Sequence, residues 1–403
     1  MTLRFAIHHR STSSGARTGR VETPHGAFDT PAFMPVGTRG SVKGLLPELV
    51  ARTGAQIILA NTYHLLLRPT PSTVAALGGL HRLMGWPGPI LTDSGGYQAY
   101  SMADLNAVDD DGVTFRSIVD GSEVRLTPES AIAAQNALGA DIIMAFDDCP
   151  PSIAAPEPGP IAADPRLARV LRRDAQLDPR ARLLLANERT VRWLQRCKDA
   201  HGRAHDQALF GIVQGGADLD QRTWSVLRVC DIDLPGYAIG GVAVGESPDD
   251  IARVVRHTAP QMPEHKPRYL MGVGYERDIV AAVRAGVDMF DCVLPTRNGR
   301  NANAFTPAGQ IRLRNARFAD DPEPIEPGGA CDCEACRPVW TGAPGPFSRG
   351  TLRHLFMSGE MLGPILVSLH NLRYFQRLMV DIRRTIRDDD WPGFARRWPA
   401  AGM

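Results

Sequence analysis

The stretch from Met289 to Asn301 combines residue types that could act on a phosphate-bearing substrate. A short apolar run ends at Asp291, and a proline, two arginines and a glycine follow it closely. We interpret the run as a buried strand that brings a carboxylate to an open end. We interpret the residues that follow Asp291 as a phosphate-holding loop, because the planar donor fork of arginine suits phosphate oxygens. The alternative is that Asp291 caps a turn or pairs with Arg297.

Similar short apolar runs recur along the chain, and helix-like segments separate most of them. The runs are Ala32 to Val36, Gln56 to Ala60, Pro89 to Thr92, Asp141 to Phe146, Leu209 to Val213, Gly236 to Ile239, Arg268 to Met271 and Val287 to Phe290. The amphipathic segments include Leu45 to Thr53, Pro128 to Leu138, Thr190 to His201, Asp220 to Val229, Pro248 to Thr258 and Asp278 to Ala285. This alternation predicts an α/β protein with a (β/α)8 (TIM) barrel. A doubly wound open sheet is the alternative, although it seldom needs eight consecutive units.

Polar residues or glycines directly follow most of these runs. They include Asn61, Asp93, Ser94, Gly95, Gly96, Tyr97, Asp147, Gln214, Gly241, Gly272 and Asp291. In a barrel the carboxyl ends of the strands meet at one mouth, where active sites form. Turn formation explains any single Asp, Asn or Gly, but it does not explain a carboxylate or amide at nearly every strand end. We therefore predict an active site at this mouth.

Three cysteines are crowded into six residues as Cys331, Cys333 and Cys336. Such a cluster fits around one tetrahedral ion, and a histidine can supply the fourth ligand. Both His354 and His370 lie downstream, and we favour His370 because it lies in an apolar helical pattern. Three thiolates and one imidazole form a closed structural zinc site without an open position for chemistry. The alternative is chance clustering.

Composition limits the class of protein. The chain has 403 residues with 43% hydrophobic and 22% charged residues, which is ordinary for a globular protein. No apolar run approaches the ~20 residues that a membrane span needs, and the N-terminus lacks a signal-peptide pattern. Seven cysteines, an odd number, favour a reduced, cytoplasmic chain over a disulfide framework. The net charge of +1 means that any nucleic-acid surface is local.

We expect three regions. Residues 1–30 form an N-terminal hairpin that caps the barrel. Residues 31–305 form the barrel, with insertions at 99–127 and 150–189, and residues 306–403 form a zinc-binding subdomain with C-terminal helices. The first insertion contains a hairpin signal, since 113–116 and 123–126 can pair across an Asp-Gly turn. The second is interpreted as irregular, with a short helix.

Arginines cluster beyond the eighth run. They are Arg297, Arg300, Arg312, Arg314 and Arg317. A surface that positions a phosphate backbone explains them, and a solvated face is the alternative.

Six motifs and the cysteine cluster together resemble the tRNA-guanine transglycosylases. The motifs are Leu91 to Gln98, Phe146 to Cys149, Gly211 to Gly216, Gly240 to Glu246, Leu270 to Gly274 and Phe290 to Arg297. The resemblance runs in order from about residue 4 to about residue 400. It implies a TIM barrel with a zinc-binding subdomain, in agreement with the patterns above. It also implies exchange of the guanine at the tRNA wobble position for a 7-deazaguanine, which in the bacterial branch is 7-aminomethyl-7-deazaguanine, the queuosine precursor.

The resemblance also implies roles for individual residues. Asp291 would be the nucleophile that attacks the ribose anomeric carbon, and Asp93 the general acid and base. The base would be bound by Asp93, Ser94, Gly95, Gly96, Tyr97, Asp147, Gln214, Gly241 and Met271. Asp147 would accept from the amidine-like edge of the purine, and Gln214 and the Gly241 amide would meet the ring carbonyl. RNA would contact Gly272, Val273, Gly274, Tyr275, Glu276, Arg277, Asp278, Thr296, Arg297, Asn298, Gly299 and Arg300.

Cys149 and Val244 resemble the bacterial branch, for which a homodimer is expected. The chain departs from the family pattern in three places: at Val242, where leucine is common near the base; in the longer 150–189 stretch; and in the longer spacing from Cys336 to His370. The extra residues of that spacing fall around 339–346.

Three other functions compete with this one. They are a non-catalytic tRNA-binding subunit, a related transglycosylase that acts on DNA or uses a nitrile base, and an unrelated barrel glycosidase or metal hydrolase. Asp93, Asp147, Gln214 and Asp291 are all present, which disfavours the first. A closed Cys3His site disfavours a catalytic zinc.

Overall fold

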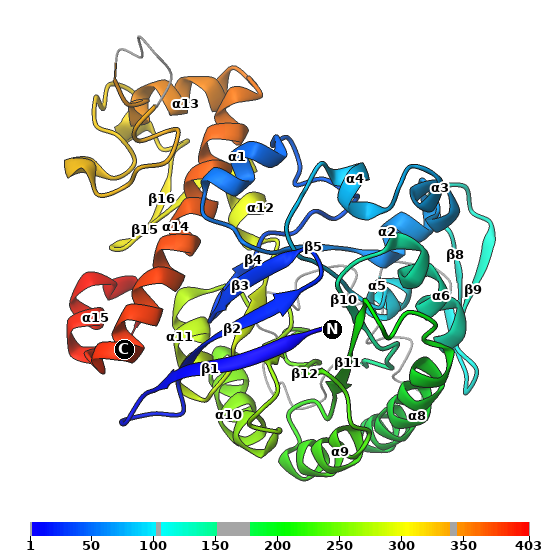
Figure 1. Ribbon diagram of the computed structural model, residues 1–403. Coiled ribbons are helices and arrows are strands. Elements are labelled where there is room, and N and C mark those ends of the chain that lie inside the picture. The colour runs from blue at the N-terminus through cyan, green and yellow to red at the C-terminus, as the bar shows by residue number, and fades with distance from the viewer. Residues whose placement is uncertain (1, 102–105, 151–177, 339–344, 403) are drawn as a thin grey trace.

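Eight parallel strands form the centre of the molecule (Figure 1). The computed structural model describes residues 2–101, 106–150, 178–338 and 345–402. The barrel strands are β4 (Ala32–Met34), β5 (Ile58–Ala60), β6 (Ile90–Thr92), β10 (Ile142–Met144), β11 (Ala208–Val213), β12 (Gly236–Ile239), β13 (Arg268–Leu270) and β14 (Met289–Asp291). Their order is β4-β14-β13-β12-β11-β10-β6-β5. A parallel bridge between Val36 and Leu59 joins the two ends of the sheet. The predicted barrel is confirmed, because all eight runs form its strands.

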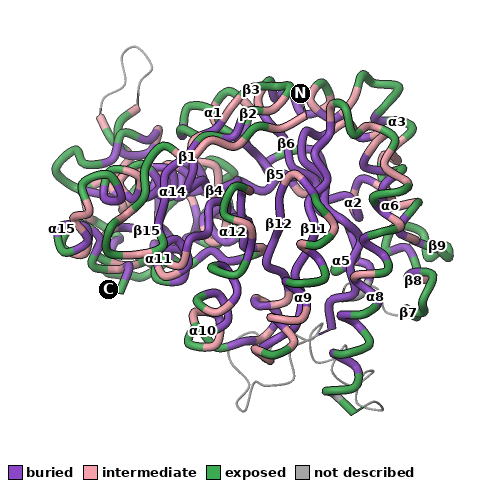
Figure 2. The backbone as a smooth tube through the Cα atoms, turned by 60° about the horizontal axis from the view of Figure 1, so that its bottom comes forward, coloured by how far each residue is buried: buried purple, intermediate pink, exposed green. Residues whose placement is uncertain are grey.

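Helices surround the barrel and bury one side each (Figure 2). They are α1 (Pro47–Arg52), α2 (Thr62–Leu67), α3 (Pro71–Ala76), α4 (Leu80–Met84), α6 (Pro128–Leu138), α8 (Pro179–Ala200), α9 (Leu219–Asp231), α10 (Pro248–Thr258), the short η1 (Ala259–Gln261) and α11 (Glu276–Arg284). Helix α10 shows which local signals allowed a helix to be predicted from the sequence. Its N-cap Ser247 accepts from the Asp250 N–H, Pro248 begins the helix, and Ile251, Val254 and Val255 are buried.

Helix α8 is longer than its pattern predicts. It begins at Pro179, not at Thr190, because the Asp178 side chain caps it by accepting from the Ala181 N–H at 3.1 Å. Part of the expected 150–189 insertion is therefore the first half of this helix. Residues 151–177 of that insertion lie outside the described part of the chain.

An antiparallel sheet closes the amino end of the barrel. It contains β1 (Arg4–Arg10), β2 (Arg17–Thr23) and β3 (Gly26–Thr30), so the predicted hairpin of β2 and β3 gains a third strand. Val21 and Phe28 are fully buried and belong to one apolar cluster with the strand residues Met34, Met144 and Phe210. This contact covers the amino end of the barrel interior, which is opposite the carboxyl ends of the strands.

The excursion after β6 contains the predicted hairpin. Helix α5 (Gly96–Ser101) precedes β7 (Asn106–Val108), β8 (Val113–Arg116) and β9 (Glu123–Leu126). Strands β8 and β9 are antiparallel, with Val113 opposite Leu126 and Arg116 opposite Glu123. The hairpin prediction is confirmed.

The segment after β14 is largely a helix, so the prediction of a loop after Asp291 is wrong. Helix α12 (Leu294–Arg300) has Pro295 in its first turn, where the missing N–H costs nothing. Gly299 lets α12 approach the long helix α14 (Leu362–Asp388), since a Cβ there would lie 2.7 Å from the Ser368 Cα. The remaining elements are β15 (Asn303–Thr306), β16 (Gly309–Arg312), η2 (Ala316–Phe318), η3 (Pro327–Gly329), α13 (Arg349–Met357), α15 (Trp391–Arg397) and η4 (Pro399–Ala401).

Helix α14 joins the C-terminal elements to the barrel. It packs on α12, β15 and β4, and Figure 1 shows it running beside the barrel from α13 to α15. None of the helices in the described ranges is long and apolar enough to cross a membrane.

Candidate active site and metal centre

A cavity of about 150 Å³ opens at the carboxyl ends of the barrel strands. Its lining includes most of the predicted base-binding residues: Asp93, Ser94, Tyr97, Asp147, Gln214, Gly241 and Met271, together with Asp291. Tyr97 is 37% exposed and stands at the rim, and Met271 is half-buried. The strand ends therefore bring residues far apart in the sequence to one site, as a barrel requires.

Asp291 ends β14 and is anchored through one oxygen. The Tyr269 hydroxyl donates to Oδ1 at 2.5 Å, and the Gly272 N–H donates to the same oxygen at 2.8 Å. Within the described residues no ion pair joins Asp291 to Arg297, so the alternative of a simple pair is not supported. Burial raises the pKa of Asp291, while these two donors lower it. The arrangement fixes the carboxylate through Oδ1, and Asp291 lines the cavity.

Asp93 also lines the cavity and accepts from a larger set of donors. The Thr62 N–H donates to Oδ1 at 2.7 Å, Gln98 Nε2 donates to Oδ2 at 2.9 Å, and Asn61 Nδ2 also donates to Oδ2. Burial nevertheless raises the pKa of Asp93 to about 6, and the charge of Asp291 adds to the rise. A carboxyl group with this pKa can give and take a proton near neutral pH.

Asp147 forms a second buried carboxyl group in the cavity. Gln214 Nε2 donates to its Oδ2 at 2.6 Å, and the Ser94 hydroxyl donates to its Oδ1 at 3.2 Å. Burial raises the pKa of Asp147 to about 6 as well, with Asp148 and Asp93 adding like charge. A buried carboxylate with partners on each oxygen suits a ligand that presents adjacent N–H donors.

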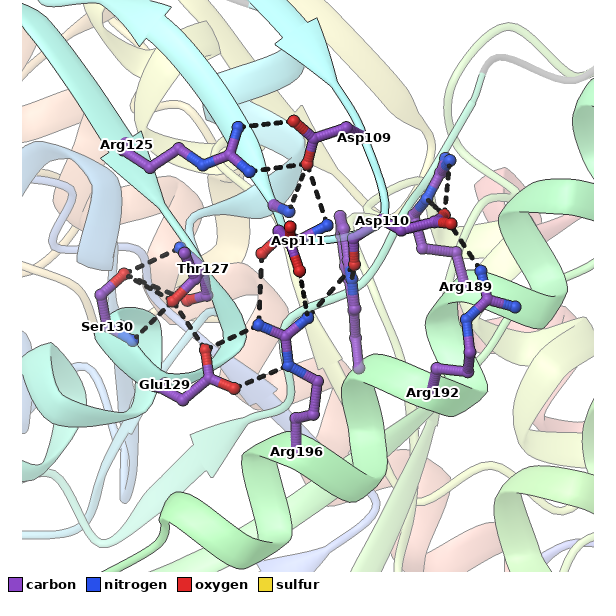
Figure 3. A network of polar contacts seen from close by, with 12 residues as sticks. Asp109, Asp110, Asp111, Arg125, Thr127, Glu129, Ser130, Arg189, Arg192 and Arg196 are labelled. Carbon is purple, nitrogen blue, oxygen red and sulfur yellow. Dashed lines mark hydrogen bonds and ion pairs between the residues drawn. The ribbon is translucent and has the colours of Figure 1, made fainter.

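A charged network holds the strand end that carries Asp147. Asp148 is buried and accepts from Arg182 at 2.7 and 2.9 Å and from Arg189 at 2.6 Å. Arg189 also reaches Asp110 in the turn between β7 and β8, beside Arg192 (Figure 3). The buried contacts couple α8 to the end of β10, whereas the exposed pairs contribute little.

Three residues singled out in the sequence, Gly95, Gly96 and Val242, are not part of the cavity lining. Gly95 and Gly96 allow close packing, since a Cβ on Gly95 would lie 3.0 Å from the Tyr63 N and one on Gly96 would lie 3.0 Å from the Asp147 carbonyl oxygen. Val242, expected near the base, is fully buried in the main core. Cys149 and Val244 do line it.

The residues predicted to contact RNA divide into exposed and buried groups. Exposed members are Gly272, Tyr275, Arg277 and Arg297, and Asn298 and Arg300 are partly exposed. The buried members are Val273, Gly274, Glu276, Asp278, Thr296 and Gly299. Burial shows that these positions shape the loop after β13 and helix α12, since Glu276 for example accepts from the Tyr374 hydroxyl at 2.9 Å.

The cysteine cluster and His370 converge on one point. The Sγ atoms of Cys331, Cys333 and Cys336 lie 3.6, 3.4 and 3.5 Å from His370 Nδ1. A tetrahedral zinc, with bonds of about 2.3 Å to sulfur and about 2.1 Å to nitrogen, separates these atoms by about 3.6 Å. All four residues are buried, so the group could hold a metal ion. His354 is exposed and does not belong to the group.

The orientation of His370 favours metal binding. Its Nε2 lies 2.8 Å from the Phe305 carbonyl oxygen, which can only accept, so Nε2 carries the proton and Nδ1 presents a lone pair. Of the extra residues expected around 339–346, residues 339–344 lie outside the described part of the chain.

A second cluster of possible ligands is explained without a metal. Asp141 accepts from His25 Nδ1 at 2.8 Å and from His81 Nε2 at 3.0 Å, and also from the N–H groups of His25 and Ile90. The two rings stack with centroids 3.6 Å apart. Face-to-face rings cannot both direct a lone pair at one ion, so the cluster ties the N-terminal sheet to α4 and β10.

Sequence patterns identified only some of the residues that support the site. Asn61 was singled out as a polar residue at a strand end, but Tyr269 and Gln98 were not assigned to the carboxylates. Tyr269 lies inside a strand and Gln98 inside α5, so neither position indicated contact with a carboxylate. The partners become visible only once the barrel closes.

Comparison with known proteins agrees with this geometry. The family model described as Queuine tRNA-ribosyltransferase matches residues 11–160 and 170–401. A protein of this name from Thermus thermophilus is 49% identical over 98% of this chain and 93% of its own length. Proteins of the same name from Cyanothece sp. and Acetivibrio thermocellus are each 48% identical, over 95% and 96% of this chain and 92% and 94% of their own lengths. The chain therefore belongs to the queuine tRNA-ribosyltransferase family.

Proposed function

We propose that this protein exchanges the guanine at the wobble position of a tRNA anticodon for 7-aminomethyl-7-deazaguanine, a step of queuosine biosynthesis. It is a tRNA-guanine transglycosylase, an enzyme of the pentosyltransferase class. Family membership over nearly the whole chain supports the reaction class. The observation that supports the mechanism is that Asp291 and the buried Asp93 both line the cavity, and that the donors to Asp291 in the described residues all bond Oδ1.

In the first half-reaction, Asp291 Oδ2 attacks C1′ of the wobble ribose. The C1′–N9 bond breaks, and the electron pair leaves with guanine, which takes a proton from Asp93. The product is an ester between Asp291 and C1′ that keeps the RNA attached to the protein. This is the logic of a retaining glycosidase with a purine as the leaving group.

In the second half-reaction, the incoming base loses its N9 proton to Asp93. Its N9 then attacks C1′ and displaces the Asp291 carboxylate, so the modified RNA is released and Asp93 is protonated again. The pKa of about 6 suits this exchange, because Asp93 must hold a proton in one step and accept one in the next.

Base recognition uses the remaining polar groups of the cavity. Asp147 accepts from the N1–H and 2-amino groups of the purine, replacing its contacts with Gln214 and Ser94. Gln214 and the Gly241 N–H donate to the ring carbonyl, while Tyr97 and Met271 contact the faces of the base. Flipping the wobble base is easier in an anticodon loop than in a duplex.

The exposed residues beside the cavity form the RNA-binding surface. Arg277 and Arg297 contact phosphates, and Tyr275 and Gly272 approach the nucleotides next to the flipped base. We expect a homodimer in the cytoplasm, as the bacterial branch implies.

Zinc is the ion that the Cys3His group fits best, because thiolates and imidazole select it and the sulfur–nitrogen spacing suits a tetrahedron. The site is structural: it ties the segment at 331–336 to α14, so that residues 306–403 form a zinc-binding unit beside the catalytic barrel of residues 31–305.

A base-exchange assay tests the function. The protein is mixed with unmodified tRNA that has a wobble guanine and with 7-aminomethyl-7-deazaguanine, and the nucleosides are analysed by mass spectrometry. Incorporation at the wobble position alone is the expected result. No incorporation by a folded, zinc-containing protein would refute the proposal. Parallel reactions with the nitrile base and with DNA separate the related transglycosylases.

A further inference from the structure

Arg222 is a fully buried cation next to the site that the chemistry above does not use. It lies in the first turns of α9, which packs outside β11 (Figure 1). Its guanidinium donates to four carbonyl oxygens: Nε to Gly216 at 2.8 Å, Nη1 to Val213 at 3.0 Å and to Gly240 at 2.8 Å, and Nη2 to Gly241 at 2.9 Å. Among the described residues it forms no ion pair with a carboxylate.

These four carbonyls belong to the ends of the two strands that bear Gln214 and Gly241. A trans peptide directs its C=O and its N–H to opposite sides. Because the Gly240 carbonyl points at Arg222, the Gly241 N–H points away from Arg222, toward the cavity that Gly241 lines. The Val213 carbonyl is held in the same way, one residue before Gln214.

Only arginine can make this set of contacts. Its planar fork has five N–H donors at fixed angles, whereas the lysine ammonium has three donors on a flexible stem. A buried charge without such partners is expensive. Burial lowers the pKa of Arg222 only to about 10, so it stays charged at neutral pH.

We propose that Arg222 is a positioning residue for base recognition. It orients the end of β12 so that the Gly241 N–H meets the ring carbonyl of a 6-oxopurine or 6-oxo-7-deazapurine. Gly241 has φ +62°, and a Cβ there would lie 2.3 Å from Gln214 Oε1, so the two base-facing groups are packed as one unit. This role rests on the proposed function.

The test pairs a variant with a ligand that lacks the contact. Dissociation constants of guanine and 2-aminopurine, which has no ring carbonyl, are measured by calorimetry for the full-length protein and for Arg222→Lys. We expect Arg222→Lys to weaken guanine binding about tenfold, the value of one hydrogen bond, and to leave 2-aminopurine binding unchanged. 2-Aminopurine also lacks the N1 proton, which weakens its contact with Asp147. This loss is the same in the wild-type protein and in Arg222→Lys, so it cancels when the two proteins are compared.

Arg268→Lys is the matched control. Arg268 is also buried and also donates to backbone carbonyls, those of Met262 and Gly286, but at the opposite end of the barrel. It should leave both dissociation constants unchanged. If Arg222→Lys cannot be purified, the neutral Arg222→Gln, which avoids a buried charge, replaces it, with the same expected loss of discrimination.

The outcomes separate the two proposals. Equal weakening of both ligands by either Arg222 variant, or no weakening of guanine, would overturn the positioning role while the wild-type protein still binds guanine. A folded wild-type protein that does not bind guanine would overturn the proposed function, and the role of Arg222 with it.

Discussion

Removing the Tyr269 hydroxyl tests how the nucleophile is prepared. Tyr269→Phe deletes the donor 2.5 Å from Asp291 Oδ1 and leaves the Gly272 N–H on the same oxygen. The hydroxyl stabilises the ionised carboxylate and holds its orientation. Its loss should therefore raise the pKa of Asp291 further, because burial already raises that pKa and the tyrosine opposes the rise.

The size of the effect follows from the kind of bond. A hydrogen bond to a charged group contributes about 1.5–3 kcal/mol, or about 10- to 150-fold in rate. The remaining Gly272 donor places the expected loss of kcat/KM at the lower end, about 10- to 30-fold near pH 6. The direction in which the pH dependence of kcat/KM changes follows from the ionisation of Asp291. Asp291 must be ionised to attack, so a raised pKa moves the acid limb of the profile to higher pH and the deficit shrinks above it.

The assay is exchange of labelled guanine into tRNA between pH 5.5 and 9. Tyr237→Phe is the control, because the Tyr237 hydroxyl bonds backbone groups of Cys230, Ile232 and Leu234, and Tyr237 does not line the cavity. It should lower stability without moving the profile. An unshifted acid limb in a folded Tyr269→Phe protein would refute the reasoning, whatever its rate.

Three further changes have defined outcomes. Asp147→Asn should raise the melting temperature at pH 7.5 but not at pH 4. Burial raises the pKa of Asp147 from 3.8 to about 6, so the wild-type protein loses up to about 3 kcal/mol of stability as pH rises through that range. Equal melting curves at pH 7.5 would contradict this. Cys333→Ser should lose its metal by elemental analysis and unfold at lower temperature; a metal-free, equally stable variant would show that the cluster is not structural. Asp148→Asn removes the buried carboxylate charge that accepts from Arg182 and Arg189 and should cost about 3–5 kcal/mol in urea unfolding; a cost below about 1 kcal/mol would exclude a buried charge network.

Local patterns predicted the barrel because each strand is a short apolar run that ends at a polar residue. A barrel places those ends together, so the sequence alone assigned Asp93, Asp147, Gln214 and Asp291 to one site. The metal site could also be predicted from the sequence, since its three cysteines are close together in the chain. His370 could be favoured over His354 because its apolar surroundings predict burial.

Long-range partners could not be predicted in this way. Nothing around Tyr269 or Arg222 indicates which carboxylate or carbonyl each will meet, because those contacts depend on the closed barrel. Pro295 and Gly299 suggested a loop after Asp291. In the structure Pro295 begins helix α12, and Gly299 allows this helix to pack on α14. At α8 the capping residue Asp178 extends the helix beyond its apolar periodicity.

The most direct test of the account is to trap the covalent intermediate on Asp291. Labelled tRNA with a wobble guanine is incubated with the protein, quenched in denaturant, and analysed on a denaturing gel and by peptide mass spectrometry. We expect a protein–RNA adduct at Asp291 and none with Asp291→Asn, although that variant still binds tRNA and retains its metal. An adduct formed by Asp291→Asn, or mapped to another residue, would contradict the central claim.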